Sequence, residues 1–402
     1  MSGRDDHLVE GRTRRSRAVI TVGAMVLLVA ALPLAYARLV GGDGEPTSAT
    51  APEVEPPSPR PTDETIAPTL GLHGRLVFAT FETRGSSERQ QQLWVLDLAT
   101  GALSEGPFVP TVEELWVADA ERGWLVLVTA DRDAQGVAYL LTALPPTAEP
   151  VELDRGDLLS LSADGEDLLV GRTEPIRRPR PGCQDHLFEL SVVSVGSGAK
   201  STLVDGSLAC GNVVAATPLD GSALVSVVVD GRPEVWQLWP DDHDVLFRDL
   251  AYLSRSSRGT LLLVDPEGGV PKGLGVWPRT PTGPLLVWPG AGSPRPLVDG
   301  TRLYAQRVVS WSPSGSQVVV NGIIGDRRGM WLVYVPTGSV EPLLPPNSFP
   351  LRSAFSGATF DDRGHAFGGA PGTIVAVADA EIVPIDLPPD APSPAGPVAW
   401  LP

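Results

Sequence analysis

The chain has 402 residues, of which 42% are hydrophobic, and it contains 43 glycines and 41 prolines. This content predicts strands and turns rather than long helices, because glycine and proline both destabilise helix interiors. The formal net charge of −17 opposes the charge of phosphate backbones, so we expect no nucleic-acid partner.

The first predicted element is a membrane-spanning helix over residues 18–37. This segment is uncharged and mostly apolar, and as a helix it would span about 30 Å, the thickness of the hydrocarbon core of a bilayer. Arginines precede it closely, at Arg12, Arg14, Arg15 and Arg17. By the positive-inside rule, residues 1–17 form a cytoplasmic tail and the bulk of the chain lies outside the cell. The alternative is a signal peptide cleaved after Ala37, within a small-x-small pattern, which would release a secreted protein.

A linker follows the helix. Residues 38–70 are rich in proline, threonine, alanine and glutamate and have no hydrophobic period. Such a composition predicts an extended, disordered spacer that lifts a domain off the membrane.

From residue 71 to residue 402 the sequence repeats at intervals of about 40 to 55 residues, which in a strand-rich chain indicates the blades of a β-propeller. The clearest unit runs from Val309 to Leu344. Turn residues at Pro313–Gly315 and Pro336–Gly338 separate its apolar runs, so that one unit supplies four antiparallel strands.

The repeat places inner strands around Trp116, Leu161, Ala216, Arg255, Trp311, Phe360 and Trp400. The last of these has no blade after it, whereas the first unit, near Leu72, begins with a second strand. The C-terminal strand should therefore complete the first blade and close the ring, which removes exposed sheet edges. We predict an all-β fold, a single propeller of about seven four-stranded blades, with six or eight as alternatives. The tryptophans at inner-strand positions are expected to pack between blades rather than line the channel.

These repeats resemble those of a known family. The segments Val309–Val320, Leu159–Arg172 and Ala215–Val229 are similar to the WD40-like repeats of TolB-type bacterial propellers, and the resemblance covers roughly residues 72–402. No Trp-Asp dipeptide occurs, so the eukaryotic WD40 signature is absent. The resemblance implies a propeller and little about activity, because one fold hosts many functions.

The chain has two cysteines, Cys183 and Cys210. Cys183 falls in a long connection between the second and third strands of the third blade, and Cys210 follows the outer strand of that blade. Both connections belong to the same face of a propeller. In an oxidising compartment we expect a disulfide between them, with two unpaired thiols as the alternative.

No linear motif of a hydrolase or a metal site occurs, such as Gly-x-Ser-x-Gly, His-Glu-x-x-His or a paired Cys-x-x-Cys. We therefore predict no catalytic residue, no metal ligand and no cofactor. The histidines beyond the linker fall in different units, at His73, His186, His243 and His365. The run Asp361–His365 is interpreted as a solvated turn.

The repeat also sorts charges by face. In each blade, one turn joins the first strand to the second and another joins the third to the fourth. Both turns lie on the same face, which we call the bottom face. Acidic residues concentrate there, whereas the opposite, top face carries candidate partner-binding arginines at Arg177, Arg178, Arg180, Arg279, Arg327 and Arg328. We expect this top face to meet an anionic ligand or an extracytoplasmic protein.

The function favoured by the sequence is a membrane-anchored, extracytoplasmic binding module without catalysis. Two alternatives stay open: an extracellular hydrolase or lyase with its site at the channel mouth, and a ligand sensor. A cluster of carboxylates or histidines at the channel mouth would favour the enzyme, and a broad apolar patch would favour a protein partner.

Overall fold

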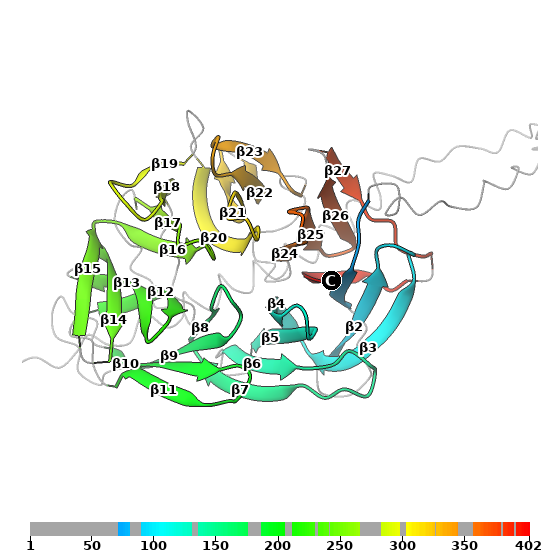
Figure 1. Cartoon of the computed structure of the whole chain (residues 1–402), viewed down its shortest axis with the longest axis horizontal. Helices are drawn as coiled ribbons and strands as arrows, with labels where there is room; N and C mark the ends of the chain where they lie inside the picture. Colours follow the sequence, from blue (N-terminus) through cyan, green and yellow to red (C-terminus); the bar gives the residue numbers. More distant parts are fainter. Residues whose placement is uncertain are drawn as a thin grey trace, which may run out of the picture. The chain divides into compact units, whose positions relative to one another are not determined.

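A computed structural model describes residues 71–80, 90–130, 136–175, 186–205, 211–229, 232–240, 242–265, 283–297, 303–325, 327–344, 357–378, 381–389 and 391–402. Every regular element in these ranges is a β-strand. The strands form seven blades around a central axis, which confirms the predicted all-β propeller and the number of its blades (Figure 1).

The strands of each blade are given from the channel outward. Blade 1 comprises β28 (Pro394–Leu401), β1 (Arg75–Thr80), β2 (Gln90–Asp97) and β3 (Leu103–Pro110). Blade 2 comprises β4 (Val112–Asp119), β5 (Trp124–Ala130), β6 (Gly136–Leu141) and β7 (Val151–Gly156). Blade 3 comprises β8 (Leu158–Leu161), β9 (Asp167–Pro175), β10 (His186–Ser194) and β11 (Lys200–Val204).

The other blades follow the same order. Blade 4 comprises β12 (Gly211–Leu219), β13 (Ser222–Val229), β14 (Arg232–Trp239) and β15 (Asp242–Arg248). Blade 5 comprises β16 (Ala251–Arg255), β17 (Leu261–Val264), β18 (Gly283–Trp288) and β19 (Arg295–Pro296). Blade 6 comprises β20 (Leu303–Trp311), β21 (Gln317–Ile324), β22 (Arg327–Tyr334) and β23 (Ser339–Pro342). Blade 7 comprises β24 (Gly357–Phe360), β25 (Ala366–Ala370), β26 (Thr373–Ala378) and β27 (Glu381–Pro384).

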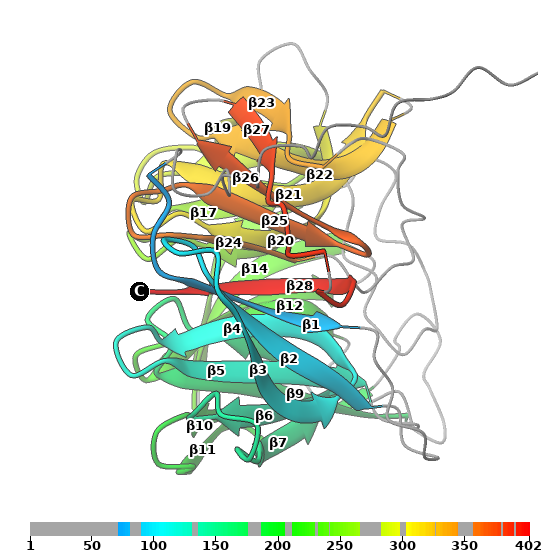
Figure 2. The same ribbon diagram turned by 90° about the vertical axis from the view of Figure 1, so that its right-hand side faces the viewer.

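The C-terminal strand closes the ring as the sequence predicts. β28 pairs antiparallel with β1, with Leu401 opposite Arg75 and Val398 opposite Phe78. The first blade therefore joins both ends of the propeller. The C-terminus lies on the bottom face, which is toward the viewer in Figure 1 and on the left in Figure 2.

The hydrophobic core consists of one cluster between each pair of neighbouring blades. Along β21, Val318 and Val320 pack into the cluster between blades 5 and 6, whereas Val319 packs into the cluster between blades 6 and 7. Successive side chains of a strand point to opposite faces, and both faces of a blade are covered. This explains why the strands appear in the sequence as continuous apolar runs rather than as alternating ones.

The inner-strand tryptophans pack between blades, as expected. Trp116 packs between blades 2 and 3, Trp311 between blades 5 and 6, and Trp400 between blades 7 and 1. The indole N–H of Trp311 donates to Ser254 Oγ (3.0 Å), and that of Trp400 donates to the backbone oxygen of His73 (2.8 Å). Each of these N–H groups thus has an acceptor on the neighbouring element.

Two predictions fall outside the described residues. In the described ranges no helix is long and apolar enough to cross a membrane, and the predicted span over residues 18–37 does not belong to these ranges. Neither Cys183 nor Cys210 is described. The anchor and the disulfide therefore stay predictions.

Candidate functional site

The bottom face is built from a recurring turn between the first two strands of a blade. In blades 3, 5, 6 and 7 the turn ends in a glycine whose N–H donates to the carbonyl oxygen three residues earlier, as in Gly165 to Ser162 (3.0 Å) and Gly364 to Asp361 (3.2 Å). These glycines have positive φ, 79° at Gly165 and 90° at Gly364. A Cβ on Gly165 would lie 1.9 Å from the carbonyl oxygen of Ala118, so this glycine also lets the turn of blade 3 approach blade 2 closely.

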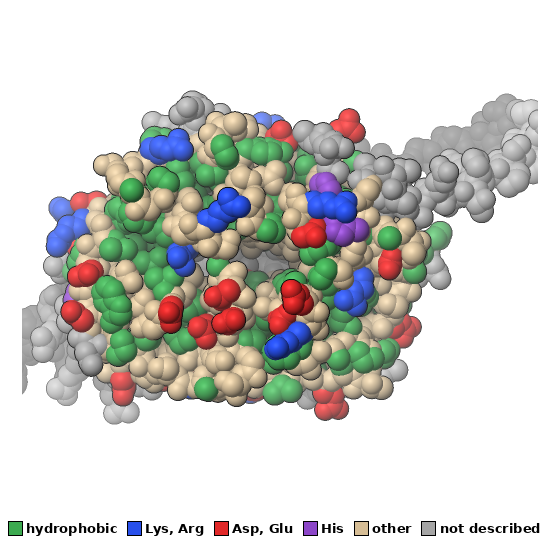
Figure 3. Space-filling model, in the orientation of Figure 1, with side chains coloured by type: hydrophobic (Ala, Val, Ile, Leu, Met, Phe, Trp, Pro, Cys, Tyr) green, Lys and Arg blue, Asp and Glu red, His purple; other side chains and the backbone are tan. Residues whose placement is uncertain are grey.

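Carboxylates crowd on the turns of three neighbouring blades. We define the acidic rim as Asp119 and Glu121 in blade 2, Asp164, Glu166 and Asp167 in blade 3, and Asp220 in blade 4. Figure 3 shows acidic side chains along one side of the central hollow, over the ends of β4, β8 and β12. The next turn, in blade 5, carries arginines instead, Arg255 and Arg258. Acidic residues therefore prevail on the turns of blades 2 to 4, where Arg122 pairs with Asp119 at 3.5 Å, and arginines prevail on the turn of blade 5.

The rim carboxylates differ in their pKa. Partial burial raises the pKa of Asp167, and the charges of Asp164, Glu166 and Asp220 raise it further. Partial burial also acts to raise the pKa of Asp164, but a hydrogen bond from the Ser162 hydroxyl (2.5 Å), the backbone N–H of Glu166 and the charge of Arg255 lower it overall. Burial and neighbouring like charges therefore both oppose the ionisation of Asp167, whereas Asp164 stays stabilised as a carboxylate.

A second cluster lies on the bottom face at the seam between blades 7 and 1. The buried carboxylate of Asp361 contacts Nδ1 of His365 at 2.7 Å, and Oδ1 of Asp362 lies 2.9 Å from Nε2 of His73. His73 precedes β1, whereas the other three residues belong to the turn between β24 and β25. The histidines therefore do converge in part, although the sequence places them in different units.

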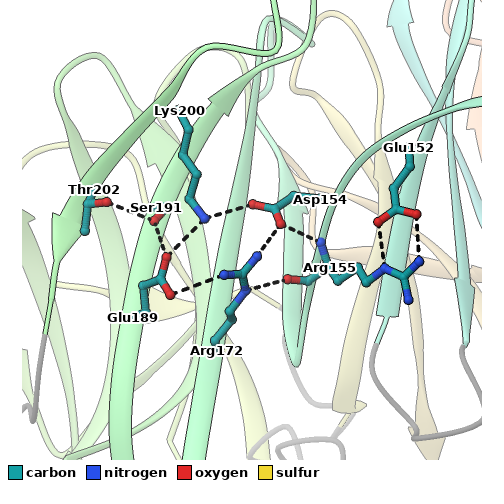
Figure 4. A network of polar contacts seen from close by, with 8 residues as sticks. All are labelled: Glu152, Asp154, Arg155, Arg172, Glu189, Ser191, Lys200 and Thr202. Atoms are coloured by element: carbon teal, nitrogen blue, oxygen red, sulfur yellow. Dashed lines mark hydrogen bonds and ion pairs between the residues drawn. The ribbon is translucent and has the colours of Figure 1, made fainter.

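A third polar cluster joins the outer parts of blades 2 and 3 (Figure 4). Lys200 lies between Asp154 (3.1 Å) and Glu189 (3.0 Å), and Arg172 also contacts both carboxylates. Hydrogen bonding to Lys200 lowers the pKa of Glu189, more than partial burial raises it. The alternating charges satisfy one another, so this cluster stabilises the contact between the blades rather than offering a free binding group.

The described part of the predicted top face is small. Arg327 and Arg328 open β22 and are exposed there, at the end of the strand opposite the bottom turns. The arginines at 177, 178, 180 and 279 lie outside the described residues. Of the predicted partner-binding residues, the described part of the chain therefore places this pair alone.

The cluster at the seam between blades 7 and 1 was not predicted from the sequence, because His73 lies far from Asp361, Asp362 and His365 in the chain. Asp361–His365 was expected to be a solvated turn, but the side chain of Asp361 is fully buried. The predicted ring closure was the available signal, since it places the residue that precedes the first strand beside the turn of the last blade.

Comparison with known proteins supports the fold only. No protein-family model and no curated protein matches the chain. Among solved structures, acylaminoacyl peptidase from Pyrococcus horikoshii is 12% identical with a TM-score of 0.51, over 78% of this chain and 51% of that one. TolB from Acinetobacter baumannii is 11% identical with a TM-score of 0.44, over 82% of this chain and 83% of that one. The chain spans about half the length of the peptidase, and at such identity the likeness carries no activity across.

Proposed function

We propose that the chain is a membrane-held, extracytoplasmic propeller that binds a partner protein without catalysis, and that the acidic rim receives a basic segment of this partner. The observation that carries the proposal is the placing of carboxylates on three neighbouring turns. Two of these turns supply the charges of Asp164, Glu166 and Asp220, which add to partial burial in raising the pKa of Asp167. A cationic partner relieves this repulsion and gains favourable charge contacts at the same time.

The surrounding fold supports a binding role. A cluster of apolar side chains holds every pair of neighbouring blades, and β28 ties the last blade to the first. Turns carried on such a framework keep their relative positions, which reduces the ordering that binding requires.

The charge pattern also favours an oriented partner. Arg255 and Arg258 lie on the turn that follows the acidic rim around the channel mouth. A partner with a single basic segment would be repelled at blade 5 and attracted at blades 2 to 4, so the rim selects one orientation.

The alternative of an enzyme draws less support from the histidines. In the described part of the chain, Nδ1 of His365 contacts Asp361, and no serine or threonine hydroxyl is hydrogen-bonded to its Nε2. Within these residues the Asp361–His365 pair therefore has no nucleophile of the kind that a serine hydrolase requires.

The predicted arginine surface of the top face remains a separate proposal for an anionic ligand or protein. It rests on Arg327 and Arg328 in the structure and on the sequence for the rest.

Affinity capture of the full-length chain from its native cells tests the proposal, after cross-linking in intact cells. The wild type is compared with a rim variant carrying Glu121→Arg, Glu166→Arg and Asp220→Arg, three exposed side chains. The control carries Glu149→Arg, Asp244→Arg and Glu381→Arg, which change the net charge equally at exposed positions on outer parts of the blades.

We expect one protein to be captured with the wild type and with the control, and to be lost with the rim variant. Mass spectrometry of the captured chain also identifies its mature N-terminus, and residues 1–37 should be present. Equal capture by all three chains would overturn the role of the rim, and an N-terminus at residue 38 would overturn the anchor.

A further inference from the structure

Asp361 occupies a position where the equivalent turns have serine. In blades 5 and 6 this position holds Ser256 and Ser312, which are as buried as Asp361, with exposed fractions of 0%, 1% and 0%. The hydroxyl of Ser256 accepts the backbone N–H of Thr260 (3.1 Å), and that of Ser312 accepts the N–H of Gln317 (3.0 Å). One buried oxygen is therefore enough to build the turn.

The carboxylate of Asp361 supplies one oxygen more than the turn needs. Its Oδ1 accepts the N–H groups of His365 (2.7 Å) and Arg363 (3.0 Å), and thus does what the serine hydroxyl does elsewhere. Its Oδ2 faces two imidazoles instead, with Nδ1 of His365 at 2.7 Å and Nδ1 of His73 at 4.0 Å. A buried charge is costly to keep where a serine serves, so a second role for the carboxylate is indicated.

His73 has a nitrogen without a partner at this place. Its Nε2 lies 2.9 Å from a carboxylate oxygen of Asp362 and is the donor of the neutral ring. Its Nδ1 then carries a lone pair, is buried and has no hydrogen-bond partner. The polar atom that faces this lone pair is Oδ2 of Asp361, another acceptor, and a separation of 4.0 Å is too long for a hydrogen bond. A cation held between them would satisfy both atoms.

We propose that His73, Asp361 and Asp362 bind a divalent transition-metal ion of the zinc type across the seam of the ring. One imidazole nitrogen and two carboxylate oxygens are ligands that zinc accepts, and two carboxylates balance its charge. The three ligand atoms lie within 4.8 Å of one another. Neighbouring ligands of a tetrahedral zinc ion with bonds of about 2.0–2.1 Å are about 3.3 Å apart. The exposed side chain of Asp362 would leave Nε2 of His73 to reach an ion at Nδ1, and a water molecule would take the fourth position.

The contact between Asp361 and His365 would orient one of the metal ligands. The imidazole of His365 holds Oδ2 of Asp361 in place, in the way that outer hydrogen bonds commonly orient metal ligands. The ion would join blade 7 to the residue that leads into β1, where the segment preceding the propeller enters it. Its role is then structural, because it would tie the residue that leads into β1 to blade 7, near the place where β28 and β1 pair without being consecutive in the chain.

Metal binding to the full-length, untagged chain tests the proposal. The chain is treated with a chelator, dialysed and titrated with Zn²⁺ in competition with a chromophoric chelator, and with Co²⁺ to record the visible bands of a bound ion. Asp361→Ser is the decisive variant, because the turns of blades 5 and 6 show that serine supports this conformation. His73→Gln is the second variant, since the hydrogen bond from Trp400 is made to the backbone of His73 and is retained.

We expect the wild type to bind one Zn²⁺ per chain and to unfold at a higher temperature when it is bound. Both variants should fold, should lose at least about tenfold in affinity and should lose the Co²⁺ bands. The control is Asp242→Asn with His243→Gln, which alters an exposed aspartate–histidine pair on the outer strand of blade 4 and should leave binding unchanged. A wild type that binds no Zn²⁺, or an Asp361→Ser chain that binds it as tightly, would overturn the site.

Discussion

Individual carboxylates on the bottom face contribute to the stability of the fold with opposite signs. Asp164 and Asp167 lie on one turn, yet hydrogen bonds and Arg255 lower the pKa of the first while burial and three carboxylates raise that of the second. A chain under selection for stability alone would not keep the second residue charged. If the acidic rim binds a partner as proposed, Asp167 is a residue at which function and stability conflict.

Replacing Asp167 with asparagine should stabilise the protein at neutral pH. A carboxyl whose folded pKa is raised opposes folding above that pKa, and this penalty disappears as the pH falls through the raised value. We expect Asp167→Asn to increase the free energy of unfolding at pH 7 by about 0.5 kcal/mol or less, since the site is partly exposed, and to have no effect near pH 3.

Denaturant unfolding at several pH values measures this effect, with Asp164→Asn as the comparison. Because the pKa of Asp164 is lowered, its replacement should decrease stability at pH 7. Two changes of the same sign would contradict the assignment of charges to this turn.

At the scale of strands and blades, a network of ion pairs joins the outer parts of blades 2 and 3 (Figure 4). Partial burial acts to raise the pKa of Asp154, but the backbone N–H of Arg155, the hydrogen bond from Lys200 and the charges of Arg172 and Lys200 lower it overall. The pKa of Glu189 is lowered as well, chiefly by its hydrogen bond to Lys200. Lys200 therefore couples the outer strand of blade 3 to blade 2.

We predict that Lys200→Gln decreases the free energy of unfolding by about 1 kcal/mol at pH 7. The lowered pKa values mean that the stabilisation is present above the ordinary values of 3.8 and 4.5 and is lost as the pH falls through the folded values. The difference between wild type and variant should thus shrink below about pH 4.

The matched change is Arg232→Gln, which removes an exposed ion pair with Asp249 at 3.6 Å. It should change stability little at any pH, because exposed pairs are screened by solvent. An equal loss in both variants, or a loss from Lys200→Gln that does not depend on pH, would contradict the account of the network.

Strands were largely predictable from the sequence, and their exceptions have a physical cause. The unit Val309–Leu344 has clear turn residues between apolar runs, and the structure forms its four strands there. Blade 5 departs from the pattern, since its outer strand is reduced to Arg295–Pro296. Proline has no N–H to donate to a ladder, and the glycines nearby favour turns.

For the whole molecule, closure of the ring was predictable from the sequence, but the polar contacts at the seam between blades 7 and 1 were not. The lone strand at the C-terminus and the missing inner strand of the first unit indicate together that the two ends of the propeller meet. What the seam contains depends on His73 and Asp361, whose contact follows only from the three-dimensional register of β28 with β1. No linear motif records such a pair.

Removal of residues 394–402 should prevent stable folding. Every residue of β28 is buried, and its loss exposes the edge of β1 and the clusters of blades 7, 1 and 2. We expect the truncated chain to aggregate or to lose cooperative thermal unfolding. Removal of the exposed Pro402 alone should have no such effect, and a monomeric truncated chain with the wild-type midpoint would contradict the closure.

The central claim is that the acidic rim binds a partner protein. Photo-cross-linking from single positions in native cells tests it most directly, with a photoreactive residue placed at Glu166 in the rim, at Glu381 on the outer strand of blade 7, or at Arg327 on the top face. The account predicts a discrete adduct with one protein from position 166 and none from position 381. An adduct from position 327 alone, or no adduct from position 166, would contradict binding at the rim and would move the partner to the arginine-bearing face or remove it altogether.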